Sequence, residues 1–180
     1  GEDVNICVEP CRRDTFPAIA LAVAYLRDVK GVALEEPVVV CPVDPYVDSG
    51  YFEAIARLGA LAVSEDVNLA LIGIEPTYPS EKYGYIIPKD PGAVSAVEAF
   101  KEKPDKDVAG EYIAKGALWN GGVFAFKLQY LLEKTREVTG LFAYEDLLQQ
   151  YEDLEKISFD YAVAEKEERI QVMRFQGKWK

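Results

Sequence analysis

The stretch Val38-Val39-Val40-Cys41-Pro42-Val43-Asp44 decides how the rest of the sequence is interpreted. A short β-branched run bounded by prolines is typical of a fully buried, parallel strand. In open α/β sheets, ligands bind beyond the carboxyl ends of the strands, which is where Asp44 falls. A carboxylate there suits Mg²⁺, which commonly takes one or two protein carboxylates together with substrate phosphates. The alternative, that Asp44 is only a turn or helix-capping residue, fits the same spacing and stays open on this pattern alone.

The bulk composition excludes several classes of protein. The 180 residues are 49% hydrophobic, which is enough for one domain with a hydrophobic core. The net charge of −11 argues against nucleic-acid and anionic-membrane partners. Because the sequence contains no histidine, Ser–His and Cys–His nucleophile pairs and histidine-bearing zinc sites are excluded. Cys7, Cys11 and Cys41 form no CxxC motif and cannot all pair, which favours a reduced, cytoplasmic setting.

Strand-like and helix-like segments alternate along the chain. We expect strands at 5–8, 38–43, 69–74, from 83 onward, and at 94–103, 123–126 and 169–175. We expect helices at 16–29, 51–58, from 105 or 107 to 116, and at 128–137, 144–151 and 158–165, with a tight turn at 118–122. The alternation predicts an α/β fold with a mostly parallel sheet and helices on both faces. Strands 5–8, 38–43 and 69–74 should be adjacent and parallel.

Six short stretches of the chain combine polar residues with prolines and glycines, and taken singly each has a structural explanation such as a turn, a bulge or a solvated edge. They are EPCRRDTFPAIALA (9–22), PVD (42–44), TYPSEKYGYI (77–86), FKEKPD (100–105), LWNGGVF (118–124) and FDYAVAEK (159–166). In this order they resemble the bacterial mannose-1-phosphate guanylyltransferases, also called GDP-mannose pyrophosphorylases, whose corresponding motifs are EPxxRNTAPAIALA, PADH, TxPxxxYGYI, FxEKPD, LWNSGMF and IDYAVMEK.

The resemblance implies a Rossmann-like nucleotidyltransferase fold, with residues 1–180 as one domain. It implies the reaction of mannose 1-phosphate with GTP to give GDP-mannose and pyrophosphate, with Mg²⁺ bound by Asp44. The resemblance is also compatible with a protein that forms a homo-oligomer. The site residues that it implies are Lys103 and Asp44 for catalysis, Glu9, Arg13 and Thr15 for the nucleotide, and Gly84, Glu102, Lys103, Asn120 and Asp160 for the sugar.

Elementary chemistry agrees with these roles. Guanine presents two adjacent donors, N1–H and the N2 amine, and the Glu9 carboxylate can accept both, whereas uracil or thymine would be better served by an amide. Nucleotidyl transfer asks mainly for positioning and for neutralised charge, which Lys103 can supply near the phosphates. The attacking sugar phosphate is already an anion, so no general base is needed and the absence of histidine is no obstacle.

The sequence departs from the family's pattern in ways that limit the resemblance. The family's glycine-rich phosphate loop, GGxGxRLxPLS, and its WxDVG metal carboxylate do not occur in residues 1–180, so the chain resembles a domain truncated at both ends. Pro45 replaces the histidine of PADH, and Asp14 replaces an asparagine and adds negative charge. We therefore expect this chain alone to be inactive. Two alternatives stay open: a nucleotidyltransferase for another sugar or base, such as glucose 1-phosphate with a thymidine nucleotide, and a non-catalytic nucleotide-sugar-binding module.

Overall fold

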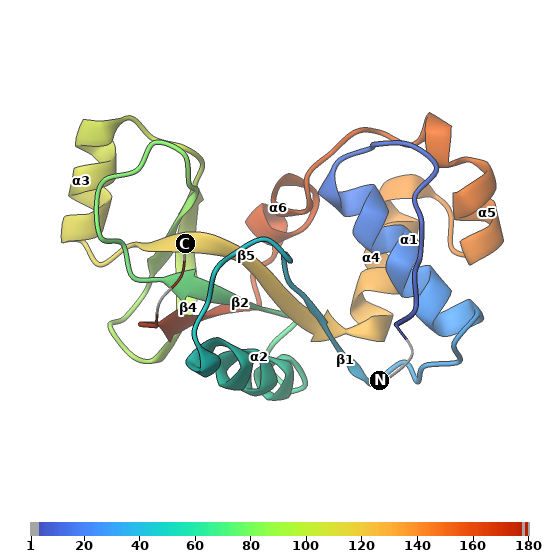
Figure 1. Ribbon diagram of the computed structural model, residues 1–180, viewed down its shortest axis with the longest axis horizontal. Coiled ribbons are helices and arrows are strands. Elements are labelled where there is room, and N and C mark those ends of the chain that lie inside the picture. Colours follow the sequence, from blue (N-terminus) through green and yellow to red (C-terminus); the bar gives the residue numbers. More distant parts are fainter. Residues whose placement is uncertain (1–3, 178, 180) are drawn as a thin grey trace. The chain divides into compact units, whose positions relative to one another are not determined.

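The chain forms two compact units in the computed structural model, which describes residues 4–177 and residue 179 (Figure 1). The helical unit comprises residues 1–36 and 127–166, and the sheet unit comprises residues 37–126 and 167–180. That residues 1–180 act as a single domain stays a prediction. Among the described residues, no helix is long and apolar enough to cross a membrane.

The helical unit is built around an almost wholly apolar helix. Its elements are α1 (Thr15–Asp28), α4 (Leu128–Thr139), α5 (Tyr144–Gln149), the 3₁₀ turn η1 (Tyr151–Asp153), α6 (Phe159–Ala162) and the 3₁₀ turn η2 (Ala164–Lys166). The Asp14 carboxylate accepts a hydrogen bond from the Thr15 amide at 2.7 Å and so caps α1. The helix ends before Gly31, whose φ of 66° suits a residue without a side chain. Phe16, Leu21 and their buried neighbours pack α1 against α4, α5 and α6, as a helix apolar on all sides requires.

The sheet unit contains one six-stranded sheet with the order β1-β5-β2-β6-β4-β3. Its elements are β1 (Pro37–Val40), α2 (Ser49–Ala62), β2 (Leu69–Ile74), β3 (Tyr85–Pro88), β4 (Val94–Lys101), α3 (Lys106–Ala114), β5 (Leu118–Lys127) and β6 (Ile170–Phe175). Every residue of β2 is buried, because this strand lies between β5 and β6 and α2 packs against it. The mixed α/β architecture predicted from the alternation is therefore present.

Three details of the predicted sheet are wrong. Residues 5–8 form no strand, and Ile6 and Val8 are 75% and 70% exposed. β1 and β2 are not adjacent, since β5 lies between them. Parallel pairing is also the minority: among described pairs with a defined register, β2–β6 is parallel, whereas β2–β5, β3–β4, β3–β5 and β4–β6 are antiparallel. A short apolar run indicates burial but carries no signal for direction, and the short connection between β3 and β4 allows only an antiparallel pair.

The predicted turn at 118–122 is instead the first half of β5. Asn120 pairs with Gly73 of β2, and the register shifts between Leu71 and Gly73. Gly122 has a φ of 69°, which a strand accommodates at an irregularity of this kind. The glycines that suggested a turn therefore bend a continuous strand. This strand carries Asn120 into the middle of the sheet.

Candidate active site

Three of the residues expected to bind the sugar lie together in the sheet unit. The Asn120 amide donates a hydrogen bond of 2.8 Å to the Gly84 carbonyl, which joins the start of β5 to the residue before β3. A side-chain carbon placed on Gly84 would lie 3.0 Å from Glu102 Oε2 and 3.7 Å from Asn120 Cβ. Residues from three separate motifs thus converge on one point, and the absence of a side chain at Gly84 leaves the Glu102 carboxylate its place.

Lys103 joins the same cluster through an ion pair with Glu102, the residue before it. Its ammonium lies 3.1 Å from Glu102 Oε1, and both side chains are largely exposed. The backbone of Lys103 has a φ of 34°, a left-handed conformation that costs about 1–2 kcal/mol for a residue with a Cβ. Strain of this kind concentrates at functional sites. The Lys103 ammonium and the Glu102 carboxylate therefore lie side by side in solvent, whereas Asn120 is half-buried and its Oδ1 accepts a hydrogen bond from the Gly122 amide at 3.0 Å.

A buried tyrosine network fixes the loop that leads to Gly84. The Tyr85 hydroxyl accepts hydrogen bonds from the Ser80 amide at 2.9 Å and from Trp119 Nε1 at 3.1 Å, and it donates to the Ser80 carbonyl at 3.0 Å. The rings of Tyr78 and Tyr83 pack on Trp119 with centroids 5.0 and 4.9 Å away. Gly84 and Asn120 are the immediate neighbours of Tyr85 and Trp119, so this network holds the cluster of Gly84, Glu102 and Asn120 in shape.

Replacing Tyr85 with phenylalanine should lower the free energy of unfolding by about 1–2 kcal/mol. The ring would still fill its site, but the Ser80 amide and Trp119 Nε1 would each lose a buried acceptor. Urea unfolding measures the change. Tyr46→Phe, at an exposed tyrosine of the same unit, is the matched control and should be neutral. Equal stability of the two variants would show that the network does not stabilise the loop.

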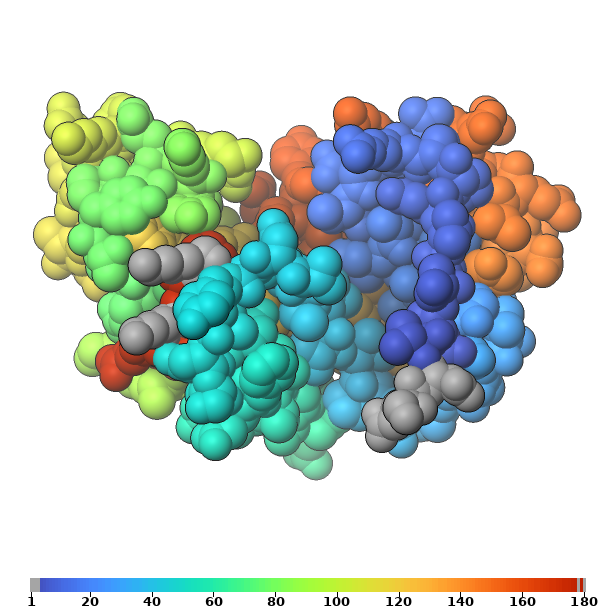
Figure 2. Space-filling model, in the orientation of Figure 1, coloured from blue at the N-terminus to red at the C-terminus, as the bar shows by residue number. Residues whose placement is uncertain are grey.

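Asp44 lies four residues beyond the end of β1, in an exposed loop rather than at the strand terminus. The segment after β1 is on the surface that Figure 2 shows in cyan. Among the described residues the Asp44 carboxylate has no hydrogen bond or ion pair, and no group of three metal-ligating side chains occurs there. That Asp44 binds Mg²⁺ together with substrate phosphates stays a prediction.

The residues expected to bind the nucleotide lie in the helical unit, on a loop pinned to residues 151–159. The Phe16 amide donates to the Ile157 carbonyl at 3.1 Å, and the Ile157 amide donates to the Arg13 carbonyl at 3.3 Å. Thr15 Oγ1 accepts from the Phe159 amide at 2.8 Å. The Thr15 hydroxyl therefore ties α1 to α6, a structural task that the sequence did not reveal.

Arg13 also faces this segment. Its Nη2 donates to the Glu152 carbonyl, while its Nε is buried without a hydrogen-bond partner among the described residues. Asp160, the fifth residue expected at the sugar, is half-buried in the first turn of α6, which Ser158 caps. Asp160 belongs to the helical unit, whereas the other four belong to the sheet unit, and its place at the sugar stays a prediction.

Glu9 has a partner that sequence reasoning missed. The hydroxyl of Tyr151, a fully buried residue, donates to Glu9 Oε2 at 2.7 Å. Burial, and next the hydrogen bond to Glu9, raise the pKa of the Tyr151 phenol, so it stays protonated and donates at neutral pH. No local pattern could have found this contact, because the two residues are 142 positions apart.

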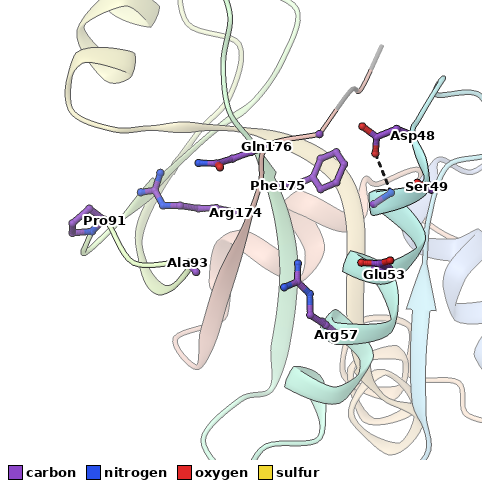
Figure 3. A pocket seen from close by; sticks show the side chains of 11 residues that line it. Asp48, Ser49, Glu53, Arg57, Pro91, Ala93, Arg174, Phe175 and Gln176 are labelled. Carbon is purple, nitrogen blue, oxygen red and sulfur yellow. Dashed lines mark hydrogen bonds between the residues drawn. The ribbon is translucent and has the colours of Figure 1, made fainter.

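A hollow in the sheet unit is lined by none of the expected site residues. It has a volume of about 690 Å³, and Figure 3 shows Arg57 of α2 and Arg174 of β6 among its lining side chains. Arg174 is already engaged, since its Nη1 lies 3.1 Å from Glu75 Oε1 and its Nε donates to the Gly92 carbonyl at 2.9 Å. Asp48 and Glu53 line the same hollow, so its charge is balanced. The hollow therefore has no excess of positive charge that would attract an anionic substrate.

Comparisons with known proteins agree with the motifs. The family model described as nucleotidyl transferase matches residues 1–179. XanB, a xanthan biosynthesis protein of Xanthomonas campestris pv. campestris strain B100, is 38% identical over 134 residues, which are 73% of this chain and 28% of that protein. AlgA, an alginate biosynthesis protein of Pseudomonas putida, is 32% identical over 99% of this chain and 40% of its own length. Mannose-1-phosphate guanylyltransferase 2 of Escherichia coli O157:H7 is 30% identical over 97% of this chain and 42% of its own length.

A solved structure also resembles the chain along almost its whole length. The crystal structure described as mannose-1-phosphate geranyltransferase from Thermus thermophilus superimposes with a TM-score of 0.82 at 35% identity, covering 98% of this chain and 54% of that one. The chain spans less than half the length of the curated relatives named here. The resemblance to mannose-1-phosphate guanylyltransferases and the nucleotidyltransferase fold, both predicted from the sequence, are thereby confirmed. The chain belongs to the nucleotidyl transferase family.

Proposed function

We propose that the chain contributes the guanine and sugar-phosphate contacts of a mannose-1-phosphate guanylyltransferase. The observation that carries the proposal is the convergence of Gly84, Glu102 and Asn120, from three motifs, on one point of the sheet unit. The family membership and the E. coli relative support a nucleotidyl transfer to mannose 1-phosphate. GTP, mannose 1-phosphate, the cytoplasmic location and a homo-oligomer are parts of this proposal.

In the proposed reaction a phosphate oxygen of mannose 1-phosphate attacks the α-phosphorus of GTP. The bond from that phosphorus to the bridging oxygen breaks, and pyrophosphate leaves. Glu102 and Asn120 orient sugar hydroxyls, and the Lys103 ammonium neutralises phosphate charge, so that the chain acts by positioning and electrostatics. Asp44 would hold Mg²⁺, which neutralises phosphate charge when bound. The Glu9 carboxylate favours guanine over thymine, because guanine offers two adjacent donors.

Titration of the ¹⁵N-labelled chain with mannose 1-phosphate tests the sugar site. We expect chemical-shift changes at the amides of Gly84, Asn120 and Lys103. Glu102→Gln should weaken this binding about 3- to 30-fold, since a charge-assisted bond to a hydroxyl is lost. Glu111→Gln, on α3, carries the same change of charge and should have no effect. Shifts confined to other parts of the sheet unit would refute the assignment.

A coupled pyrophosphate-release assay addresses catalysis by the chain itself. With GTP, mannose 1-phosphate and Mg²⁺, we expect no turnover above background. Residues 1–180 contain no glycine-rich loop to hold a triphosphate through backbone N–H groups, and Asp44 alone leaves the position of Mg²⁺ to substrate phosphates that no such loop holds. Turnover comparable to that of a full-length relative would show that residues not identified here build the phosphate site.

A further inference from the structure

The contact between Tyr151 and Glu9 joins a buried donor to a partly exposed acceptor. Tyr151 is 0% exposed and begins η1, directly after α5. Its hydroxyl lies 2.7 Å from Glu9 Oε2, within the usual range for an O–H donor bound to a carboxylate. Glu9 is half-buried, and its Oε2 is the oxygen that the Tyr151 hydroxyl holds. A phenol in this position restricts rotation of the carboxylate.

The segment that carries Tyr151 also fixes the backbone of the Glu9 loop. Glu152, the next residue, accepts a hydrogen bond from Arg13 through its carbonyl. Ile157 pairs with the backbone on both sides of Thr15, by its amide to Arg13 and by its carbonyl to Phe16. The loop and its carboxylate are therefore positioned by a single neighbouring segment, residues 151–157, which lies far away in the sequence.

Recognition of guanine by a carboxylate depends on orientation. The N1–H and N2–H donors of guanine lie parallel in one plane, and both carboxylate oxygens must meet them together. Each carboxylate oxygen has two lone pairs, so Oε2 can accept from Tyr151 and still accept from the base. A ligand side chain that is held before binding loses less freedom when the ligand arrives, and its affinity is correspondingly higher.

We propose that Tyr151 is a positioning residue that orients the Glu9 carboxylate for the two adjacent donors of guanine. This inference rests on the proposed function, because it requires that Glu9 contact the base. Tyr151 itself touches no substrate. Its contribution is to the selectivity between bases with two such donors and bases with one.

Guanosine and inosine separate this role from a purely structural one, since inosine lacks the N2 amine but keeps N1–H. In titrations of the ¹⁵N-labelled chain, Tyr151→Phe should weaken guanosine binding about 3- to 10-fold and inosine binding less, so the preference for guanosine falls. The phenylalanine ring still fills the buried site. Tyr161→Phe, at an exposed tyrosine of the same unit, is the matched control and should change neither affinity.

The double variant with Glu9→Gln gives an independent readout. If Tyr151 acts through Glu9, then Tyr151→Phe should have little further effect on guanosine binding once Glu9 is glutamine. A structural role would lower the stability of both backgrounds in urea unfolding and leave the guanosine-to-inosine ratio unchanged.

The outcomes distinguish this inference from the proposed function. If the wild-type chain prefers guanosine through Glu9 but Tyr151→Phe keeps that preference, the role of Tyr151 is refuted and the proposed base site stands. If the wild-type chain does not prefer guanosine, or Glu9→Gln leaves the preference intact, both are refuted. A reduced ratio in Tyr151→Phe, absent in the double variant, supports both.

Discussion

Replacing Gly73 with alanine is expected to lower the free energy of unfolding of the sheet unit by about 3 kcal/mol, at the upper end for over-packed cores. A Cβ at this position would lie 2.5 Å from Leu118 Cδ1, 2.7 Å from Val172 Cγ2 and 2.9 Å from Leu118 Cβ. Both neighbours are fully buried, one in β5 and one in β6, so neither can move aside without disturbing the sheet. Gly73 therefore allows β2, β5 and β6 to pack closely beside Asn120, with which it pairs.

Gly110 provides the matched control for this substitution. It lies in α3, and a Cβ there would meet nothing within 4 Å. Gly110→Ala should therefore raise the free energy of unfolding, by about 0.5–1 kcal/mol, because glycine is costly inside a helix. Both tryptophans, Trp119 and Trp179, belong to the sheet unit, so intrinsic fluorescence in urea reports its unfolding. Changes of the same sign in the two variants would contradict the packing argument.

Replacing Glu9 with glutamine should weaken guanosine binding about 10- to 100-fold and leave mannose 1-phosphate binding unchanged. An anionic acceptor becomes an amide whose N–H₂ group faces the donors of guanine, and a hydrogen bond to a charged group is worth about 1.5–3 kcal/mol. The Tyr151 hydroxyl would also lose its charged acceptor. Titrations of the labelled chain with each ligand measure the two affinities separately.

Glu145→Gln is the control for the change in charge. Glu145 is exposed on α5 of the same helical unit, so its replacement alters the net charge equally without touching the Glu9 loop. We expect wild-type guanosine affinity in this variant. Wild-type guanosine affinity in both variants would remove Glu9 from the base site, whereas an equal loss of affinity in both would indicate that only the overall charge matters.

Local signals predicted α1 well because its ends are encoded by neighbouring residues. Asp14 caps its start, Pro17 suits its first turn, and Gly31 follows its end. By contrast, Asn120, Gly121 and Gly122 predicted a turn, yet they lie within β5, because pairing with β2 and β3 outweighs the local preference of glycine. The order of the strands depends on such distant pairs, and no run of apolar residues specifies its partner.

In the candidate site, too, features encoded by neighbouring residues could be predicted and contacts between distant residues could not. Glu9, Glu102 and Asn120 could be predicted because they lie in short motifs that resemble a known family. The residues that hold them could not: the Tyr85 network connects β3 to β5, and Tyr151 reaches Glu9 across most of the chain. Supporting residues of this kind are recognisable only once the backbone has brought them together.

The helical unit is assembled from residues 1–36 and 127–166, with the first part of the sheet unit inserted between them. During synthesis, α1 leaves the ribosome with its apolar surface complete while α4, α5 and α6 do not yet exist. Phe16 and Leu21 therefore reach their partners in α4, α5 and α6 only after residues 127–166 have been made. Bringing residues 1–36 and 127–166 together closes a loop of residues 37–126, which costs chain entropy before any contact is gained. This cost slows folding, and the unfolded chain has more time in which it can aggregate.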